Sequence, residues 1–541
     1  MNLLLFKENI DTQFPNEIEQ EQVQTKVATK RKKSTSKKFW QKTHKWLGLI
    51  MSLFVLNFAI SGIILNHREI FVGLDLPRWT LPGEYSYHNW NNAAIKGILP
   101  GENSNIVYGN VGVWKENSGK FTDMNTGFPS GMDNKNVQSM LKSEKGNLYA
   151  GTFNAFYYQS GNHWKQLILP TDEQRVIKIL EKDSKILLLT RSEIVFFNDN
   201  PANPKFSVKQ IKPEKGYIAQ TGLFQTLWQL HSGEAFWMIG RLFVDFLAIT
   251  FILLIFTGLI KWYLPKTFKK LKAKKEKLAN RKKINLWSLS LHNQFGLWTA
   301  LFLFLTTITG MFLRPPLLIL VGANKVPQLP GTNLKQDNAW FDKLRNITYL
   351  PDEHRYVFAT DEYLFSVDEN FQENPEIYNY QPTISVMGTN VLETRHDGGV
   401  LVGSFSGLFL WYPKENLIFD YVNKTEYVPQ MALTGPPIGA NAVSGFGVLA
   451  DGREYYFDYS TGSYPLNSDY FFPRMSEEIL QKSGISLWNT ALEFHTARIF
   501  RSLIGDFYIL IIPLSGILIA LSILAGFIYW FQAYKGKKLL R

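Results

Sequence analysis

The stretch THKWLGLIMSLFVLNFAISGIIL, residues 43–65, decides the fold class. It is almost wholly apolar over about 20 residues, the length needed to cross the roughly 30 Å hydrocarbon core of a bilayer. Three further segments are as long and as apolar. The four predicted spans run from about Trp46 to Leu65, Leu242 to Ile260, Phe295 to Leu313 and Phe507 to Phe531. The sequence therefore predicts an integral membrane protein with four transmembrane helices.

Composition narrows the function classes. The chain has 541 residues, a net charge of +12 and no cysteine. The lack of cysteine excludes disulfides, thiolate metal sites and iron–sulfur clusters within this chain. The Lys and Arg residues gather beside the apolar segments, so they indicate membrane topology and not a nucleic-acid surface. We therefore expect membrane lipid as a partner and no nucleic acid. The first apolar patch, Leu3 to Phe6, is too short for a cleavable signal peptide.

Basic runs beside the spans predict the orientation. The segment before the first span, the loop from Lys261 to Lys283 and the C-terminal KGKKLLR are all Lys-rich, so both termini and this loop are expected in the cytoplasm. The predicted organisation is a disordered basic tail (1–38), a first membrane helix (39–67), an extracytoplasmic β insertion (68–225), a second membrane helix (226–263), a basic cytoplasmic loop (264–286), a third membrane helix (287–315), a second extracytoplasmic insertion (316–490), a fourth membrane helix (491–534) and a cytoplasmic tail (535–541).

The first and third spans share an internal repeat. His44 is followed by Gly48 and Gly62, and His292 is followed by Gly296 and Gly310, so both read His-x3-Gly-x13-Gly. Small residues at the same two heights indicate that helices approach closely at equivalent places.

Spans two and four match more loosely. His231-Ser-Gly leads into Gly240-Arg241 and Asp245, while His495-Thr-Ala leads into Arg501, Gly505 and Asp506. The membrane part is therefore expected to be a four-helix bundle of two repeated helix pairs, related by a pseudo-two-fold axis normal to the membrane.

The repeat places the histidines in pairs. His44 and His292 are expected at matching cytoplasmic positions, and His231 and His495 at matching external positions. Two imidazoles that face one axis can supply both axial ligands of a haem iron. Ionisable groups that face a bundle interior are functional candidates by default. We therefore predict haem-iron ligation by these four histidines, with one haem site at each end of the bundle. The alternative for any one of them is an ordinary interfacial side chain.

Three arginines could serve the propionates of such a cofactor. Arg498 lies three residues after His495, on the same helical face, and Arg501 lies about one turn further. Arg241 lies near the external end of span two. The alternative is that Arg241 pairs with Asp245, or that these residues pair with Asp506 and Arg501.

His67 complicates the external end. It closes the first span, and Pro315 takes its place in the repeat. It could be an external ligand, serve another ligand, or lie in the interface beside Arg68. The distance is also a difficulty, because the 23 residues from His44 to His67 span about 35 Å of helix. A kink at Pro513 or a lower external site would shorten the gap.

The span sequences resemble the PepSY-associated transmembrane family. The resemblance rests on residues 43–65 and 291–312 with the segments LHSGEAFWMIGRLFVDFLAITFILLIFTGLIKWY (230–263) and FHTARIFRSLIGDFYILIIPLSGILIALSILAGFIYWF (494–531). It implies a bacterial inner-membrane protein that carries haem b, and ligand roles for His44, His231, His292 and His495. It further implies transfer of electrons from quinol or a cytoplasmic donor to an external ferric complex such as a ferric siderophore. The insertions depart from the family, because they contain no PepSY module.

The insertions carry a β pattern of their own. NVQSMLKSEKGNLYAGTFNAFYYQSGNHWKQL (136–167) aligns with NVLETRHDGGVLVGSFSGLFLWYPKENLIFDY (390–421), strand for strand. Weaker copies occur at 106–122, 176–198, 354–380 and 443–465, which makes about six blade-like units split between the insertions. This favours one all-β, propeller-like extracytoplasmic domain built from both insertions. Two half-domains or a sandwich are the alternatives.

Two functions follow from these patterns. The first is a haem-bearing electron-transfer protein that acts as a ferric-complex reductase. The second is a non-enzymatic membrane anchor whose β domain docks an envelope protein or senses a ligand. The remaining histidines of the insertions show no metal-ligand spacing, and the insertions contain no catalytic constellation.

Overall fold

The computed structural model describes residues 17–268, 275–428 and 440–534. The chain forms two compact units. One, the membrane unit, consists of Met1–Gly62, Leu223–Asn324 and Phe507–Arg541. The other, the β unit, consists of Ile63–Gly222 and Lys325–Asp506.

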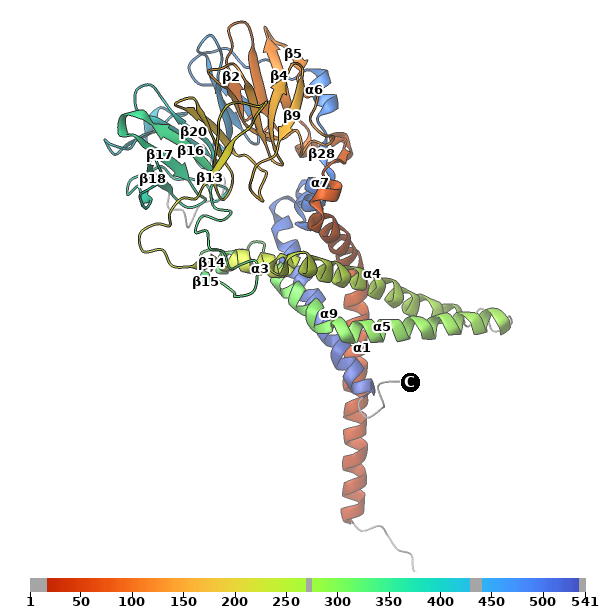
Figure 1. Cartoon of the computed structure of the whole chain (residues 1–541). Coiled ribbons are helices and arrows are strands. Elements are labelled where there is room, and N and C mark those ends of the chain that lie inside the picture. The colour runs from red at the N-terminus through yellow and green to blue at the C-terminus, as the bar shows by residue number, and fades with distance from the viewer. Residues whose placement is uncertain (1–16, 269–274, 429–439, 535–541) are drawn as a thin grey trace, which may run out of the picture. The chain divides into compact units, whose positions relative to one another are not determined.

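Long apolar helices form the membrane unit (Figure 1). They are α1 (Glu17–Asn66), α4 (Trp237–Phe268), α5 (Lys275–Met311) and α9 (Ile511–Tyr534), with the short α3 (Leu223–Ser232) before α4. Within the described ranges, four helical segments are long and apolar enough to cross a membrane: Thr35–Asn66, Glu234–Phe268, Lys277–Met311 and Arg498–Tyr534. The prediction of four spans is confirmed, and the chain is a membrane protein.

Some predicted boundaries differ from the structure. Residues 17–38, predicted as part of a disordered tail, belong to α1. Glu, Gln, Lys and Ala favour helix, and these residues continue the helix of the first span towards the N-terminus. Most of the predicted basic loop is also helical, since α4 ends at Phe268 and α5 begins at Lys275. Pro513 is the third residue of α9, where proline starts a helix instead of kinking it. Residues 1–16 and the tail 535–541 lie outside the described residues.

Apolar side chains hold the spans together. Met51 and Val55 of α1 pack with Ile519 of α9, and Phe251 of α4 lies against them. Helix α5 packs along both α4 and α9. The spans therefore enclose a common interior to which each contributes one face.

Among the described residues, six antiparallel sheets of three to five strands make up most of the β unit. Sheet 1 has β2 (Gly97–Leu99), β3 (Asn105–Gly109), β4 (Gly112–Asn117) and β5 (Lys120–Asp123); sheet 2 has β6 (Val137–Lys142), β7 (Leu148–Thr152), β8 (Phe156–Ser160) and β9 (His163–Leu167); sheet 3 has β10 (Lys178–Lys182), β11 (Lys185–Leu189), β12 (Ile194–Phe197) and β13 (Phe206–Lys209). Sheet 4 has β16 (Asn346–Leu350), β17 (Arg355–Ala359), β18 (Leu364–Asp368) and β19 (Glu376–Ile377); sheet 5 has β20 (Thr389–Thr394), β21 (Val400–Ser404), β22 (Gly407–Tyr412), β23 (Leu417–Asp420) and β24 (Thr425–Glu426); sheet 6 has β25 (Val443–Val448), β26 (Glu454–Asp458) and β27 (Gly462–Pro465). All six blade-like sequence units fall on these sheets.

A separate hydrophobic core lies between each sheet and the next. Val113 and Met140 represent the core between sheets 1 and 2, and the cores between sheets 2 and 3, 3 and 4, 4 and 5, and 5 and 6 are built in the same way. A further core, with Trp114 and Tyr455, lies between sheet 6 and sheet 1. In five of these sheets the second strand is buried on both faces, which explains apolar runs such as ILLL (186–189) in β11, whereas β3 of sheet 1 alternates.

Asn89 covers the open edge of the three-stranded sheet 6. Its carbonyl accepts the N–H of Ser463 at 2.8 Å, and its side chain bonds the carbonyls of Thr461 and Ser463. Because Pro465 has no N–H, this edge strand has little left to offer a further strand. A segment from the start of the first insertion thus completes the last sheet of the second.

Two small sheets extend the repeat beyond the spans. Strand β1 (Asp75–Leu76), which follows span one, pairs with β28 (Ile485–Ser486), which precedes α7 (Leu487–His495). Strand β15 (Lys325–Pro327), which follows span three, pairs with β14 (Gln220–Gly222), which precedes α3. Each short helix then ends near a predicted ligand, His231 in α3 and His495 in α7.

Candidate functional site

His44 is held by the last span. It lies on α1, and its Nδ1 is 2.8 Å from the backbone carbonyl oxygen of Ser522 on α9. A carbonyl can only accept, so Nδ1 carries the proton and donates it. The Nε2 lone pair is then the one available to a metal, and a ligating histidine commonly donates its other ring N–H in this way.

His292 is held in the same way by the second span. It lies on α5, and its Nδ1 is 3.0 Å from the hydroxyl oxygen of Thr257 on α4. That hydroxyl donates its own proton to the carbonyl of Leu253 at 2.7 Å, so it accepts from Nδ1. Ser288, one turn before His292, donates to the carbonyl of Thr257 and fixes the two helices at this height.

The two imidazoles face each other. Their ring centroids lie 5.9 Å apart with an interplanar angle of 65°. Glycines of spans four and two make room for them: a Cβ at Gly526 would lie 2.8 Å from Nδ1 of His44, and one at Gly258 would lie 3.5 Å from Cε1 of His292. The predicted cytoplasmic histidines are thus brought together, each against a glycine of a different span.

An elongated cavity surrounds this pair. Its volume is about 390 Å³, within the range of small-molecule and cofactor sites. All four spans line it, and its lining extends from Gln41 to Val55 along α1, which is roughly 21 Å of helix. Its walls are mainly apolar, with two lysines, Lys45 of α1 and Lys261 of α4, among the lining residues.

The residues of this cavity fit a haem. Two imidazoles on opposite sides of one metal, with metal–nitrogen bonds of about 2 Å, place their ring centroids roughly 6 Å apart, which agrees with the separation of His44 and His292. Both rings have the tautomer that leaves Nε2 for a metal. The apolar walls suit a macrocycle, and Lys45 and Lys261 are cations that could meet its propionates.

His231 lies against span three. Its Nδ1 is 2.9 Å from the carbonyl oxygen of Thr306 on α5, so this ring also donates from Nδ1 and leaves Nε2 for a metal. The ring also fills the space above Gly310, the second glycine of the repeat. Although His231 precedes span two by several residues in sequence, the chain turns at Gly233 (φ +84°) and α3 packs on α5.

His495 has the same local backbone as His231. Two residues after each histidine the chain is left-handed, at Gly233 and at Ala497 (φ +60°). A 3-10 turn follows, and then a residue with φ near +55° and ψ near −145°, namely Trp237 (52°, −144°) or Gly505 (58°, −147°). The second copy contains one extra turn, α8 (Arg501–Ile504). The repeat of spans two and four is therefore real, whereas the pairing of His231 with His495 stays a prediction, since they lie in different units.

Acidic residues bind two of the predicted propionate arginines. Arg498 forms an ion pair of 2.5 Å with Glu493, which also accepts from the hydroxyl of Tyr85. Arg501 forms an exposed pair of 3.3 Å with Asp506 of its own segment, an arrangement that the sequence analysis did not consider. Arg241 lies one turn before the buried Asp245 on α4.

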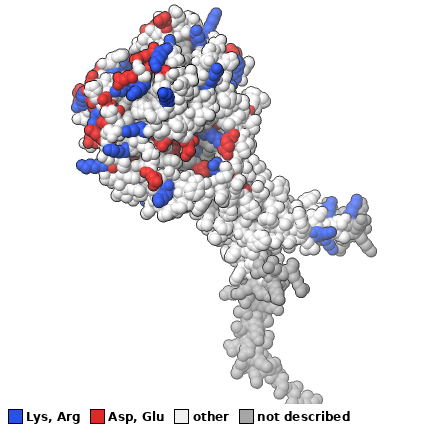
Figure 2. All heavy atoms as spheres, viewed as in Figure 1, with Lys and Arg blue, Asp and Glu red and all other residues white. Residues whose placement is uncertain are grey.

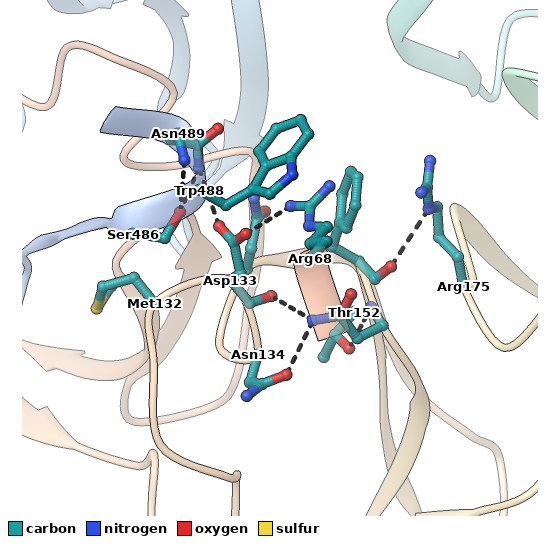
Figure 3. Close-up of polar contacts among 12 residues, drawn as sticks. Arg68, Met132, Asp133, Asn134, Thr152, Arg175, Ser486, Trp488 and Asn489 are labelled. Atoms are coloured by element: carbon teal, nitrogen blue, oxygen red, sulfur yellow. Dashed lines mark hydrogen bonds and ion pairs between the residues drawn. The ribbon is translucent and has the colours of Figure 1, made fainter. Parts of the chain in front are cut away.

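His67 ends span one beside a well-built cluster. Its Nδ1 lies 3.7 Å from Glu69, and the next residue, Arg68, forms an ion pair of 2.6 Å with the buried Asp133. The guanidinium of Arg68 lies between the rings of Trp488 and Phe153, with centroids at 4.2 and 4.0 Å (Figure 3).

This cluster continues through Phe153. The guanidinium of Arg175 also packs on the Phe153 ring, 3.7 Å from its centroid. Asp133 also accepts from Asn489 of α7 at 2.9 Å. The end of span one, sheet 2 and the helix that carries His495 are thus joined by one polar stack, which gives His67 a structural neighbourhood independent of any metal.

The sequence matches the family described as the PepSY-associated TM region over residues 169–533. The chain belongs to this family. The matched range holds three of the four spans, and within it lie His231, His292 and His495 of this PepSY-associated TM protein.

Solved structures resemble this PepSY-associated TM protein only distantly. The extracellular domain of a protein described as a one component system from B. thetaiotaomicron has a TM-score of 0.33 at 8% identity, covering 71% of this chain and 40% of that chain. PorZ, a surface component of the type-IX secretion system of Porphyromonas gingivalis, has a TM-score of 0.31 at 9% identity, covering 69% and 38%. This chain thus spans about two fifths of the length of each. No curated protein matches the sequence.

Sequence reasoning missed the residues that orient the ligands. Thr257, Ser522, Gly258 and Gly526 lie on spans two and four, where the repeat was aligned only at its external end. Aligning Phe-Thr-Gly (256–258) with Leu-Ala-Gly (524–526) would have paired Gly258 with Gly526 and drawn attention to Thr257, but it would not have identified Ser522. The same signal would have placed Lys261 beside the cavity.

Proposed function

We propose that this protein is a haem-b-containing electron-transfer protein of the bacterial inner membrane that reduces an external ferric complex. The observation that carries the proposal is the His44–His292 pair, with ring centroids 5.9 Å apart and both Nδ1 atoms engaged by a neighbouring span. A haem held by His44 and His292 would supply one-electron redox chemistry at this site.

The chain's own residues set the properties of this site. The carbonyl of Ser522 and the hydroxyl of Thr257 fix the ring planes and make both imidazoles better donors. The apolar walls exclude water from the ring pair. Lys45 and Lys261 supply positive charge among the lining residues, where carboxylates of a cofactor would be neutralised.

A second haem at the external end is part of this proposal. His231 has the same donor arrangement as the cytoplasmic pair, with Nδ1 bound to a carbonyl and a repeat glycine beneath the ring. Its partner in the repeat is His495, with His67 as the competing ligand. Electrons would enter from quinol or a cytoplasmic donor and leave towards the external face.

We propose further that the six sheets form a six-bladed β-propeller. The support is that the first strands β2, β6, β10, β16, β20 and β25 contact one another in succession and β25 also contacts β2. Asn89 joining sheet 6 to the first insertion supports the same arrangement. The basic runs beside the spans support a periplasmic place for this domain and cytoplasmic termini. Figure 2 shows Lys and Arg gathered at the tip of the α4–α5 hairpin, within an otherwise largely uncharged helical part.

A visible spectrum of the purified protein tests the redox proposal. We expect a sharp reduced α-band of a b-type haem after dithionite, with about two haems per chain by pyridine haemochrome. His44→Ala is expected to remove one of them, and the double variant His44→Ala with His495→Ala is expected to remove both. His163→Ala, an exposed histidine of β9, is the matched control and should leave the spectrum unchanged.

A colourless preparation from haem-replete cells contradicts the proposal. The protein would then be a membrane anchor whose β unit docks an envelope protein or senses a ligand. If the haem is present, reduction of an external ferric siderophore by membrane vesicles tests the acceptor.

A further inference from the structure

A second polar site lies in the β unit, where three first strands begin. Lys96 directly precedes β2, Arg175 lies three residues before β10, and Arg345 directly precedes β16. All three side chains are half-buried. Residues that precede first strands which contact one another lie at one end of the sheet assembly. Hydrogen bonds and ion pairs join these three residues into one network.

The first part of the network joins Lys96 to Arg175. The ammonium of Lys96 donates to the side-chain oxygen of Asn136 at 3.1 Å. The carbonyl of Asn136 accepts from the backbone N–H of Phe153 at 3.0 Å, and the carbonyl of Phe153 accepts from Nε of Arg175 at 3.2 Å. Sheets 1, 2 and 3 therefore meet here through main-chain and side-chain hydrogen bonds.

The second part joins the two insertions. The backbone N–H of Leu344 donates to the carbonyl of Arg191 at 2.9 Å. The guanidinium of Arg191 pairs with Asp342, and Arg345 donates to the carbonyl of Asp342 at 2.8 Å. The carboxylate of Glu173 links this part to the first, because it pairs with Arg175 and accepts the backbone N–H of Arg191. Arg345 and Arg175 therefore belong to one network, although they come from different insertions.

The charges of this network do not balance. Each arginine in and beside this network has a carboxylate partner. The pairs are Arg175 with Glu173, Arg191 with Asp342, Arg345 with Asp361 and, across the Phe153 ring, Arg68 with Asp133. Within the described part of the chain, Lys96 has no acidic partner, only the neutral Asn136. Burial and the neighbouring Arg175 lower the pKa of Lys96 to about 7. A half-buried ammonium without a counter-charge is costly to the fold, so a bound anion would relieve it.

We propose that the face formed by Lys96, Arg175 and Arg345 binds a carboxylate-bearing metal chelate. Guanidinium groups present paired N–H donors that match the two oxygens of a carboxylate, and Lys96 adds the uncompensated positive charge. That the chelated metal is ferric iron rests on the proposed function, because the chelate would be the external electron acceptor. In Figure 2, Lys, Arg, Asp and Glu side chains surround a hollow in the surface of the β unit.

Gallium(III) citrate tests this site without redox chemistry. Titration calorimetry is done on the full-length protein in detergent, because Ga(III) resembles Fe(III) but is not reduced. We expect Lys96→Met to weaken binding by about tenfold or more and Lys96→Arg to keep it. Lys115→Met, which removes an exposed lysine of β4 in the same sheet, is the matched control and should bind like the wild type.

The pH dependence gives a second readout. Lys96 carries its charge below a pKa of about 7 and loses it above, so affinity should fall about tenfold between pH 6 and pH 8. Lys96→Arg should remove this dependence, since the guanidinium stays charged. Thermal unfolding separates binding from structure: Lys96→Met should leave the melting temperature unchanged or raise it, because it removes an unpaired charge.

The outcomes are distinct from those of the haem spectrum. Wild-type protein that binds neither gallium citrate nor citrate overturns the site, as does Lys96→Met protein that binds like the wild type. A colourless preparation that still binds gallium citrate through Lys96 contradicts the electron-transfer proposal and supports the chelate-binding site. A haem-bearing preparation that does not bind gallium citrate supports the electron-transfer proposal and contradicts the chelate-binding site.

Discussion

Nδ1 of His292 and the hydroxyl oxygen of Thr257 lie 3.0 Å apart, and this contact joins span three to span two at the height of the cavity. The threonine hydroxyl donates a hydrogen bond to the carbonyl of Leu253 and accepts one from the imidazole N–H of His292. A side chain outside the repeat motif thereby selects the tautomer of a predicted haem ligand.

Thr257→Val should loosen the ligand without removing it. The isosteric change deletes the acceptor of the His292 N–H, and loss of such an outer partner typically costs 10–100-fold in metal affinity. We expect a lower haem content and a shifted midpoint potential, with Thr257→Ser restoring both. Optical redox titration measures the potential. The control is Thr299→Val on α5, a buried threonine that donates to its own helix and touches neither histidine; an equal effect there would show that the hydroxyl of Thr257 has no special role.

Gly526→Ala should displace His44. The new Cβ would lie 2.8 Å from Nδ1, and the ring is already bound to Ser522, so it cannot retreat without losing that bond. Overpacking of this kind costs about 1–3 kcal/mol. We expect reduced haem retention and a weaker low-spin spectrum. Gly258→Ala is the repeat-related control, because its Cβ would be in ordinary contact with His292 at 3.5 Å and should change the spectrum little.

Much of this arrangement follows from sequence periodicity. The spacing His-x3-Gly-x13-Gly predicts which residues of spans one and three share a height, and His44 and His292 do face each other. The apolar runs predict the four spans, because burial in lipid leaves no other choice for a backbone that must satisfy its own hydrogen bonds. The alternating strands predict six sheets, since each strand is set by local pattern.

What periodicity does not contain is the partner across the bundle. The carbonyl of Ser522 that holds His44 belongs to a residue 478 positions away, and any side chain at that position has a carbonyl. The acidic partners of the arginines are equally hard to predict. Glu493 lies five residues before Arg498, but helical spacing alone does not show that Arg498 pairs with this carboxylate and not with a propionate. Residues 17–38 differ from the prediction for another reason: their polar composition is typical of disorder, whereas their helix propensity favours the observed helix.

The absence of cysteine allows a direct test of topology. Single cysteines at Ser118, in the β4–β5 turn, and at Glu415, in the β22–β23 turn, are both exposed and should react with a membrane-impermeant maleimide in spheroplasts. A cysteine at Lys277, on α5 beside the basic run, should react only after permeabilisation. Labelling of Lys277→Cys in intact spheroplasts would reverse the orientation, and with it the direction of electron flow.

Asp133→Asn should destabilise the β unit through Arg68. Asp133 is buried, whereas Arg68 is a quarter exposed. Breaking this 2.6 Å pair should therefore lower the free energy of unfolding by about 2–3 kcal/mol, less than the loss of a fully buried pair. The change also disturbs the bond from Asn489, which anchors the helix leading to His495 (Figure 3). Thermal unfolding followed by tryptophan fluorescence should report it, since Trp488 stacks on Arg68. The exposed pair of Asp183 with Lys182 is the control, and Asp183→Asn should leave the transition unchanged. If Asp133→Asn unfolds at the wild-type temperature, as the Asp183→Asn control should, the stack at the end of span one contributes nothing to the stability of the β unit.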